Sequence, residues 1–205
     1  MRALIAAWAL ALAFALWGCN GGLPWSGGTE SGGNLRADYY DRLTSPRAFP
    51  QPDPLSVHIA STLTDTGGAV TDEVRDAVRD ALDQWDQGLS WLRFSYVAAP
   101  DNANITVLFA VMAQGVTIAR TDVTPGSDDR TIESSSILLL CQPAPHRIRL
   151  TAVQEVGRAL GIDGQSPNPL DVMYGRPNLV YNPTARDLAT LTRVYQECGV
   201  LPTDE

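Results

Sequence analysis

Alternating apolar and polar residues predict five strands in the middle of the chain. In the stretch LSVHIASTL, Leu55, Val57 and Ile59 fall on one side, which is the period-two pattern of a half-buried strand. His58 lies on the polar side of the same stretch, so we expect it to face solvent. Four later stretches show similar alternation or apolar runs between turn residues. The five predicted strands are LSVHIASTL at 55–63, SWLRFSYV at 90–97, NITVLFAV at 104–111, GVTIARTDV at 115–123 and SSILLLC at 135–141.

Three segments have the spacing of amphipathic helices. Between residues 71 and 85, apolar residues recur every three or four positions, and Thr71 or Asp72 is the expected N-cap. A second helix is predicted to start near Arg147 and to end at Gly161 or Gly164. A third is predicted after NPTARDL, with Asn182 as the cap and Pro183 in the first turn. Its apolar face comprises Leu188, Leu191, Tyr195 and Cys198. This order of strands and helices predicts an α+β fold.

The amino terminus predicts export. Within residues 1–18, Arg2 precedes an apolar run that is too short to span a membrane comfortably. The following LWGC at 16–19 resembles the lipobox of bacterial lipoproteins, although Trp17 is bulkier than the small residue usual there. The resemblance implies cleavage before Cys19, a lipidated Cys19 and attachment to a membrane of the cell envelope. The alternative is cleavage after AFA at 13–15, which would release a soluble protein.

The segment after the cysteine predicts a tether. Residues 20–34 are rich in Gly and Ser, the composition of a flexible linker. We therefore divide the chain into a lipoprotein signal at 1–18, a lipidated N-terminus and tether at 19–50, and a folded domain at 51–205. Asn20 replaces the Asp that can retain lipoproteins at an inner membrane, which favours the outer membrane or the cell surface.

Composition narrows the function classes. The chain has 205 residues and a net charge of −8, and all 15 basic residues are arginines. No three basic residues are consecutive, which argues against nucleic acid as a partner. Lipidation of Cys19 would leave Cys141 and Cys198, which an oxidising envelope would allow to form a disulfide. Two buried free thiols are the alternative.

A family resemblance comes from the last third of the chain. QEVGRALGIDG at 154–164 has Glu155, Gly157 and Gly161 where the metzincin motif H-E-x-x-H-x-x-G-x-x-H of the matrixin branch has Glu, Gly and Gly. LDVMYG at 170–175 resembles the Met-turn of the same family, with Met173 in place. The resemblance implies a metzincin-like zincin fold: a twisted, mixed five-stranded sheet packed on long helices, with a C-terminal helix after the Met-turn.

The zinc ligands of that family are missing. Gln154, Arg158 and Gly164 occupy the three histidine positions, and the chain has only two histidines, His58 and His146. Catalytic zinc needs about three protein ligands, and Arg offers a positive charge without a lone pair. We therefore expect no metal and no cofactor. An ion pair or hydrogen bond between Glu155 and Arg158 is expected in place of the metal-bound water.

These observations predict a pseudoenzyme of the metallopeptidase family, anchored to a membrane through Cys19. Its expected activity is binding of a peptide or envelope protein by strand addition at residues 115–123, with the cleft left unblocked at Gly164. One alternative is a metallopeptidase that uses Asp163, Asp171 and Glu155 as ligands and base. Another is a purely structural lipoprotein.

Overall fold

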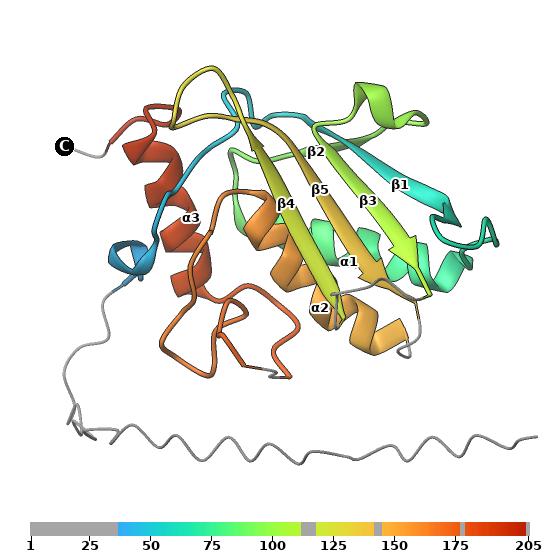
Figure 1. The fold of residues 1–205 in the computed structure, drawn as a ribbon. Coiled ribbons are helices and arrows are strands. Elements are labelled where there is room, and N and C mark those ends of the chain that lie inside the picture. Colours follow the sequence, from blue (N-terminus) through green and yellow to red (C-terminus); the bar gives the residue numbers. More distant parts are fainter. Residues whose placement is uncertain (1–36, 112–117, 142–144, 177–178, 204–205) are drawn as a thin grey trace, which may run out of the picture. The chain divides into compact units, whose positions relative to one another are not determined.

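Five strands form one mixed sheet with the order β2-β1-β3-β5-β4. β2, β1, β3 and β5 run parallel to one another, and β4 pairs antiparallel with β5 at the edge of the sheet. Figure 1 shows β4 as the outermost strand next to β5. The strands are β1 (Leu55–Leu63), β2 (Phe94–Tyr96), β3 (Ile105–Ala110), β4 (Ala119–Pro125) and β5 (Ile132–Leu140).

This computed structural model describes residues 37–111, 118–141, 145–176 and 179–203. They belong to one compact unit that spans Leu35–Glu205. The predicted export signal, Cys19 and the Gly/Ser-rich tether lie outside the described residues. Within the described ranges, no helix is long and apolar enough to cross a membrane.

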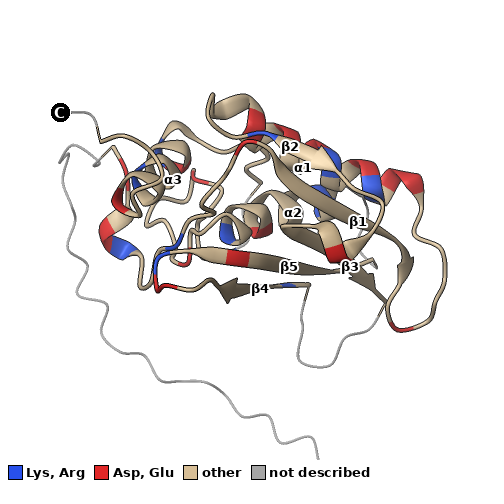
Figure 2. Cartoon of the chain, turned by 90° about the horizontal axis from the view of Figure 1, so that it is seen from above, with Lys and Arg blue, Asp and Glu red and all other residues tan. Residues whose placement is uncertain are grey.

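Helices α1 (Asp72–Gly88) and α2 (Pro145–Ala159) pack on the same face of the sheet (Figures 1 and 2). Both contact strands as well as each other. The predicted apolar stripe of α1 is its buried face, and the Trp85 indole donates a hydrogen bond to the Val153 carbonyl of α2 at 2.9 Å. The buried residues of α1 are Val74, Ala77, Val78, Ala81, Leu82 and Trp85. The α+β class and the five-stranded mixed sheet follow the prediction.

The third helix, α3 (Ala185–Glu197), begins later than predicted. Thr184 is its N-cap, not Asn182, and accepts a hydrogen bond from the Asp187 backbone N–H. Asp187 in turn accepts from the Thr184 N–H, which completes a capping box. Reciprocal satisfaction of two backbone donors favours Thr184 over an Asn two residues earlier.

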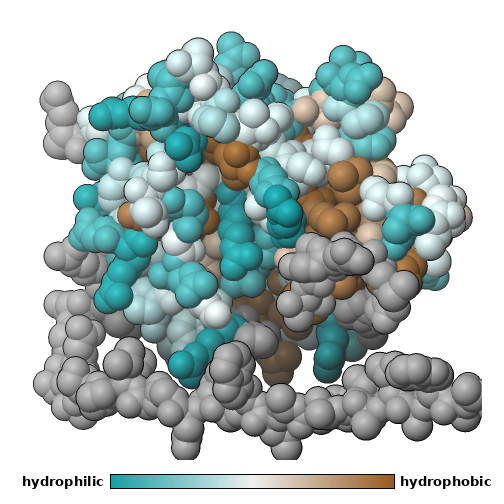
Figure 3. Space-filling model, in the orientation of Figure 1, coloured by the Kyte–Doolittle hydropathy of each residue, from teal (hydrophilic) through white to brown (hydrophobic). Residues whose placement is uncertain are grey.

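None of the helices α1, α2 and α3 covers the second face of the sheet (Figure 2). By strand alternation this face carries Thr106, Ser134 and Ser136 near the start of β3 and β5, and Leu108 and Leu138 further along. Figure 3 shows this face as mainly hydrophilic, with a hydrophobic area toward one end.

The segment that precedes β1 is part of the folded core. Tyr39, Ala48 and Phe49 are buried, so the packed unit begins well before residue 51. Ala48 forms a parallel bridge with Thr131 at the start of β5. Its N–H donates to the Arg130 carbonyl at 3.0 Å, and its carbonyl accepts from the Ile132 N–H at 2.9 Å.

The same segment crosses the end of α2 at Gly161. Gly161 has φ +116, and a Cβ atom there would lie 1.9 Å from the Arg47 carbonyl oxygen. This position therefore requires glycine for two independent reasons: the backbone conformation and the close approach of residue 47.

The predicted disulfide does not form. Cys141 and Cys198 are both free. Cys141 follows the last residue of β5, whereas Arg130, just before β5, donates to the Glu197 carbonyl beside Cys198. The nine residues of β5 thus separate the two cysteines, which corresponds to roughly 30 Å at the usual rise of a strand. A disulfide needs Cα atoms within about 7 Å.

The Gly161→Ala variant should be strongly destabilised. Positive φ and the contact with the Arg47 carbonyl together predict a loss of about 2 kcal/mol or more in the free energy of unfolding. Gly67→Ala is the matched control, because Gly67 has φ +69 but open space around its Cβ position. Urea unfolding followed by circular dichroism measures both. Equal losses for the two variants would contradict the close approach at Gly161.

Cys141 and Cys198 should both be alkylated without prior reduction once the chain is unfolded. In the native protein, burial raises the pKa of the Cys141 and Cys198 thiols, so little thiolate is present at neutral pH and labelling should be slow. Labelling should accelerate as the pH rises. Peptide mapping by mass spectrometry measures the extent of alkylation at each cysteine in the native and the unfolded chain. A linked Cys141–Cys198 peptide would overturn the assignment of free thiols.

Candidate functional site

Helix α2 brings three of the predicted residues to one side of its surface. The Gln154 amide donates to the Tyr174 carbonyl at 2.9 Å. One Glu155 carboxylate oxygen accepts from the Arg158 guanidinium at 2.6 Å, and the other accepts from the Thr121 hydroxyl at 2.5 Å. The ion pair predicted between Glu155 and Arg158 is therefore confirmed.

The two members of this ion pair differ in exposure. The Glu155 side chain is 4% exposed, and the Arg158 side chain is 35% exposed. Both Glu155 oxygens have protein donors, whereas Arg158 has five N–H donors and uses one of them on Glu155. The cation is thus the part of the cluster that solvent can reach.

Met173 packs against α2 at Gly157. It is fully buried, and a Cβ atom at Gly157 would lie 2.6 Å from its sulfur and 2.7 Å from the Trp85 ring. The absence of a side chain at position 157 lets the methionine and the tryptophan pack directly against the helix. Met173 is therefore a packing residue that contacts α2 at Gly157.

A buried carboxylate holds the turn that contains Met173. Asp187 is 0% exposed and accepts hydrogen bonds from the Val172 and Met173 N–H groups at 3.0 and 3.3 Å. It also accepts from the Tyr39 hydroxyl at 2.7 Å and from the Thr184 N–H at 2.8 Å. Burial, with the Asp187 charge beside it, raises the pKa of the Tyr39 hydroxyl far above its ordinary value, so Tyr39 stays a donor.

Gly164 does not join the cluster, and it is not an unblocked position. A Cβ atom there would lie 2.7 Å from the Arg42 carbonyl oxygen and 2.9 Å from the Leu43 side chain. The expectation of an opening at Gly164 is wrong because the segment before β1 packs over it. No local sequence pattern indicates the contact of this segment with Gly164.

The two aspartates considered as alternative metal ligands have other roles. Asp163 accepts from the Thr44 and Ser45 N–H groups at 3.1 and 2.5 Å, which fixes the segment before β1. Asp171 is buried, accepts from the Ser166 hydroxyl and lies 3.3 Å from the Arg186 Nε.

The residues at the three histidine positions do not fit a zinc ion. Gln154 is hydrogen-bonded to a carbonyl through its amide nitrogen, Arg158 carries a fixed positive charge, and Gly164 has no side chain. Zinc sites use imidazole, thiolate or carboxylate donors. In the part of the chain that the structure describes, no group of three or more His, Cys, Asp or Glu side chains could hold a metal.

Strand β4 presents a backbone edge beside the cluster. The Ile118 carbonyl accepts from the Leu140 N–H at 3.0 Å, which marks a hydrogen-bonded pair with β5. Because such pairs alternate in antiparallel strands, the N–H and C=O groups of Ala119, Thr121 and Val123 point away from β5. β4 ends the strand order, so no described strand pairs with this outer edge.

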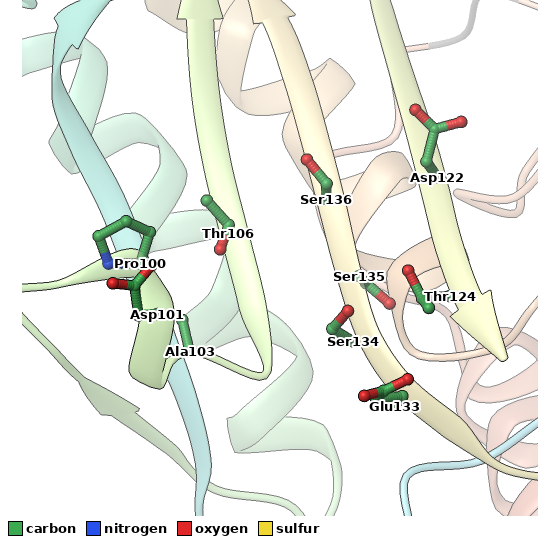
Figure 4. A pocket seen from close by; sticks show the side chains of 10 residues that line it. All are labelled: Pro100, Asp101, Ala103, Thr106, Asp122, Thr124, Glu133, Ser134, Ser135 and Ser136. Carbon is green, nitrogen blue, oxygen red and sulfur yellow. The ribbon is translucent and has the colours of Figure 1, made fainter. Parts of the chain in front are cut away.

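A separate hollow of about 530 Å³ lies on the uncovered face of the sheet (Figure 4). The short helix η2 (Pro100–Asn102) borders one side and β4 the other. No arginine is among its lining residues, so it has no positive charge for an anionic ligand. It is lined by Pro100, Asp101, Ala103, Thr106, Asp122, Thr124, Glu133, Ser134, Ser135 and Ser136. Of the residues predicted for the site, only Asp122 of the predicted edge at 115–123 lines this hollow.

Sequence reasoning missed two supporting residues: Thr121, which completes the cluster on α2, and Asp187, which holds the turn that contains Met173. Thr121 was predicted to lie in an edge strand, but its hydrogen bond to Glu155 spans 34 residues and has no local signal. Asp187 could have been recognised as the residue three positions after Thr184 in a capping box, but its bonds to Val172 and Met173 depend on tertiary packing.

Asp187→Asn should destabilise the protein by about 3 kcal/mol, because an amide replaces a buried carboxylate that accepts five backbone and hydroxyl hydrogen bonds. Tyr39→Phe removes only one of these donors and should cost about 1 to 2 kcal/mol. Chemical unfolding of both variants measures the difference. If Asp187→Asn left the free energy of unfolding nearly unchanged, this hydrogen-bond network would not be what holds the turn.

Comparison with known proteins finds no matching family model and no curated protein of similar sequence. The structure resembles a chain of the solved complex described as the GM1 bound form of the ECX AB5 holotoxin, with a TM-score of 0.50 and 12% sequence identity. The match covers 74% of this chain and 86% of that chain. At this identity the likeness concerns the fold alone.

Proposed function

We propose that this chain is an envelope lipoprotein whose folded domain is a degenerate, matrixin-like metzincin. In this proposal Cys19 carries the membrane anchor, and the domain does not hydrolyse peptides. It binds an extended segment of a peptide or an envelope protein along the outer edge of β4. The observation that carries the binding proposal is the outward-pointing backbone of Ala119, Thr121 and Val123 beside the Glu155–Arg158 pair.

The position of the motif residues supports a metzincin-like domain. Glu155 and Gly157 lie on one helix, Gly161 has positive φ directly after it, and Met173 packs against that helix from a following turn. An antiparallel edge strand runs beside the same helix, and the Thr121 hydroxyl connects the two. These features occur in the order that the sequence resemblance implies.

The chemistry of the cluster argues against hydrolysis. A general base must be available to take a proton from water. Glu155 instead accepts from Thr121 and Arg158 and is nearly inaccessible. Arg158 also places a positive charge where a catalytic cation would have to bind.

Strand addition is the binding mode best supported by the backbone. An extended ligand that pairs with β4 would satisfy the N–H and C=O groups of alternate residues and would lie next to α2. The affinity of such a complex comes mainly from main-chain hydrogen bonds, and the neighbouring side chains supply specificity.

Val123→Pro should weaken peptide binding at least about fivefold. Proline removes the outward N–H of residue 123, while the hydrogen bonds between β4 and β5 use the residues on either side. Val123→Ala is the matched control, since it shortens the side chain but keeps the N–H. The measurement is fluorescence anisotropy of labelled ten-residue peptides selected from a random library on the purified full chain.

Circular dichroism of both variants establishes that the fold is kept. Equal binding by the Val123→Pro, Val123→Ala and unsubstituted chains would exclude strand addition at β4. Failure of the unsubstituted chain to select any peptide from the library would exclude the proposed function itself.

A further inference from the structure

Specificity at the β4 edge follows from the direction in which a bound strand would point its side chains. A ligand residue directly opposite Thr121 would exchange backbone hydrogen bonds with it, because the Thr121 N–H and C=O point outward. Side chains of directly paired residues lie on the same face of a sheet. The side chain of that ligand residue therefore projects to the same side as the Thr121 side chain.

That side is occupied by α2. The Thr121 hydroxyl lies 2.5 Å from a Glu155 carboxylate oxygen and 3.4 Å from the Glu155 carbonyl oxygen. Arg158 is one turn further along the same helix and is bonded to the other oxygen of Glu155. A ligand side chain opposite Thr121 is thus directed toward the Glu155–Arg158 pair.

The pair discriminates between charges although its net charge is zero. Glu155 is 4% exposed and both of its oxygens accept protein hydrogen bonds, so it offers nothing to a ligand cation. Arg158 is 35% exposed and has N–H donors beyond the one bonded to Glu155. A planar guanidinium with free donors matches a carboxylate, to which it can donate two parallel hydrogen bonds.

We infer that Arg158 selects a peptide carboxylate at the position opposite Thr121. The carboxylate comes from an Asp or Glu side chain or from the end of the ligand chain, and Arg158 binds either through the same donors. This inference rests on the proposed strand addition at β4 and names the ligand chemistry of that site.

The test uses the purified full chain and a positional-scanning library of ten-residue peptides. One half of the library has acetylated and amidated ends, and the other half has a free C-terminal carboxylate. In each pool one position is fixed as Glu, Gln or Lys, and fluorescence anisotropy gives the apparent affinity. Pools with Glu at one position, or pools with the free end, should bind about three- to tenfold more tightly than the matched Gln or amidated pools. Lys pools should bind no better than Gln pools.

Arg158→Gln should abolish the preference for the carboxylate, so that Glu and Gln pools bind this variant with equal affinity. The double variant Glu155→Gln/Arg158→Gln is the matched control for folding, because it removes both charges and keeps an acceptor for Thr121. Val123→Pro should weaken all pools alike. Preference within the blocked library identifies an acidic side chain, and preference only for the free end identifies the chain terminus.

The outcomes separate the two proposals. If no pool binds the unsubstituted chain, the proposed function fails. If pools bind and Val123→Pro weakens them, but Glu and Gln pools are equal or Arg158→Gln keeps the preference, the role of Arg158 is overturned and strand addition stands.

Discussion

The buried carboxylate of Asp187 is the interaction on which the rest of the domain depends. It accepts hydrogen bonds from Tyr39, from the Val172 and Met173 backbone and from Thr184. These donors belong to three segments that are distant in the sequence: the segment before β1, the turn below α2 and the start of α3. A buried acceptor without these donors would be costly, so the carboxylate and the three segments require one another. Asp187 thereby sets where Met173 packs and where α3 begins.

The polar cluster on α2 depends on the same arrangement. Met173 supports the helix from below at Gly157, and the Tyr174 carbonyl, one residue further along, accepts from Gln154. On the other side of the helix, β4 supplies the Thr121 hydroxyl to Glu155. The cluster is therefore held between the turn and the edge strand by hydrogen bonds within the protein.

Local patterns predicted the regular elements well, and tertiary contacts account for most of what they missed. The alternation at 55–63 predicted β1 to the residue, and the apolar stripe of 71–85 predicted the buried face of α1. The stretch at 90–97 contains only three strand residues, because β2 pairs with β1 along Phe94–Tyr96 alone. The disulfide and the opening at Gly164 were wrong for a different reason. Composition cannot show that nine residues of β5 separate the two cysteines or that the segment before β1 packs against Gly164.

A buried glutamate also explains why the residue at position 158 is not neutral. Glu155 is nearly inaccessible, and a single hydroxyl from Thr121 would leave one of its oxygens without a donor. Arg158, one turn away, provides that donor together with the compensating charge, and its length lets the remainder of the guanidinium reach solvent. A lysine or a glutamine could satisfy the oxygen but would not present a planar set of unused donors beside the β4 edge. The same arginine thus stabilises the interior of the cluster and determines the chemistry of its surface.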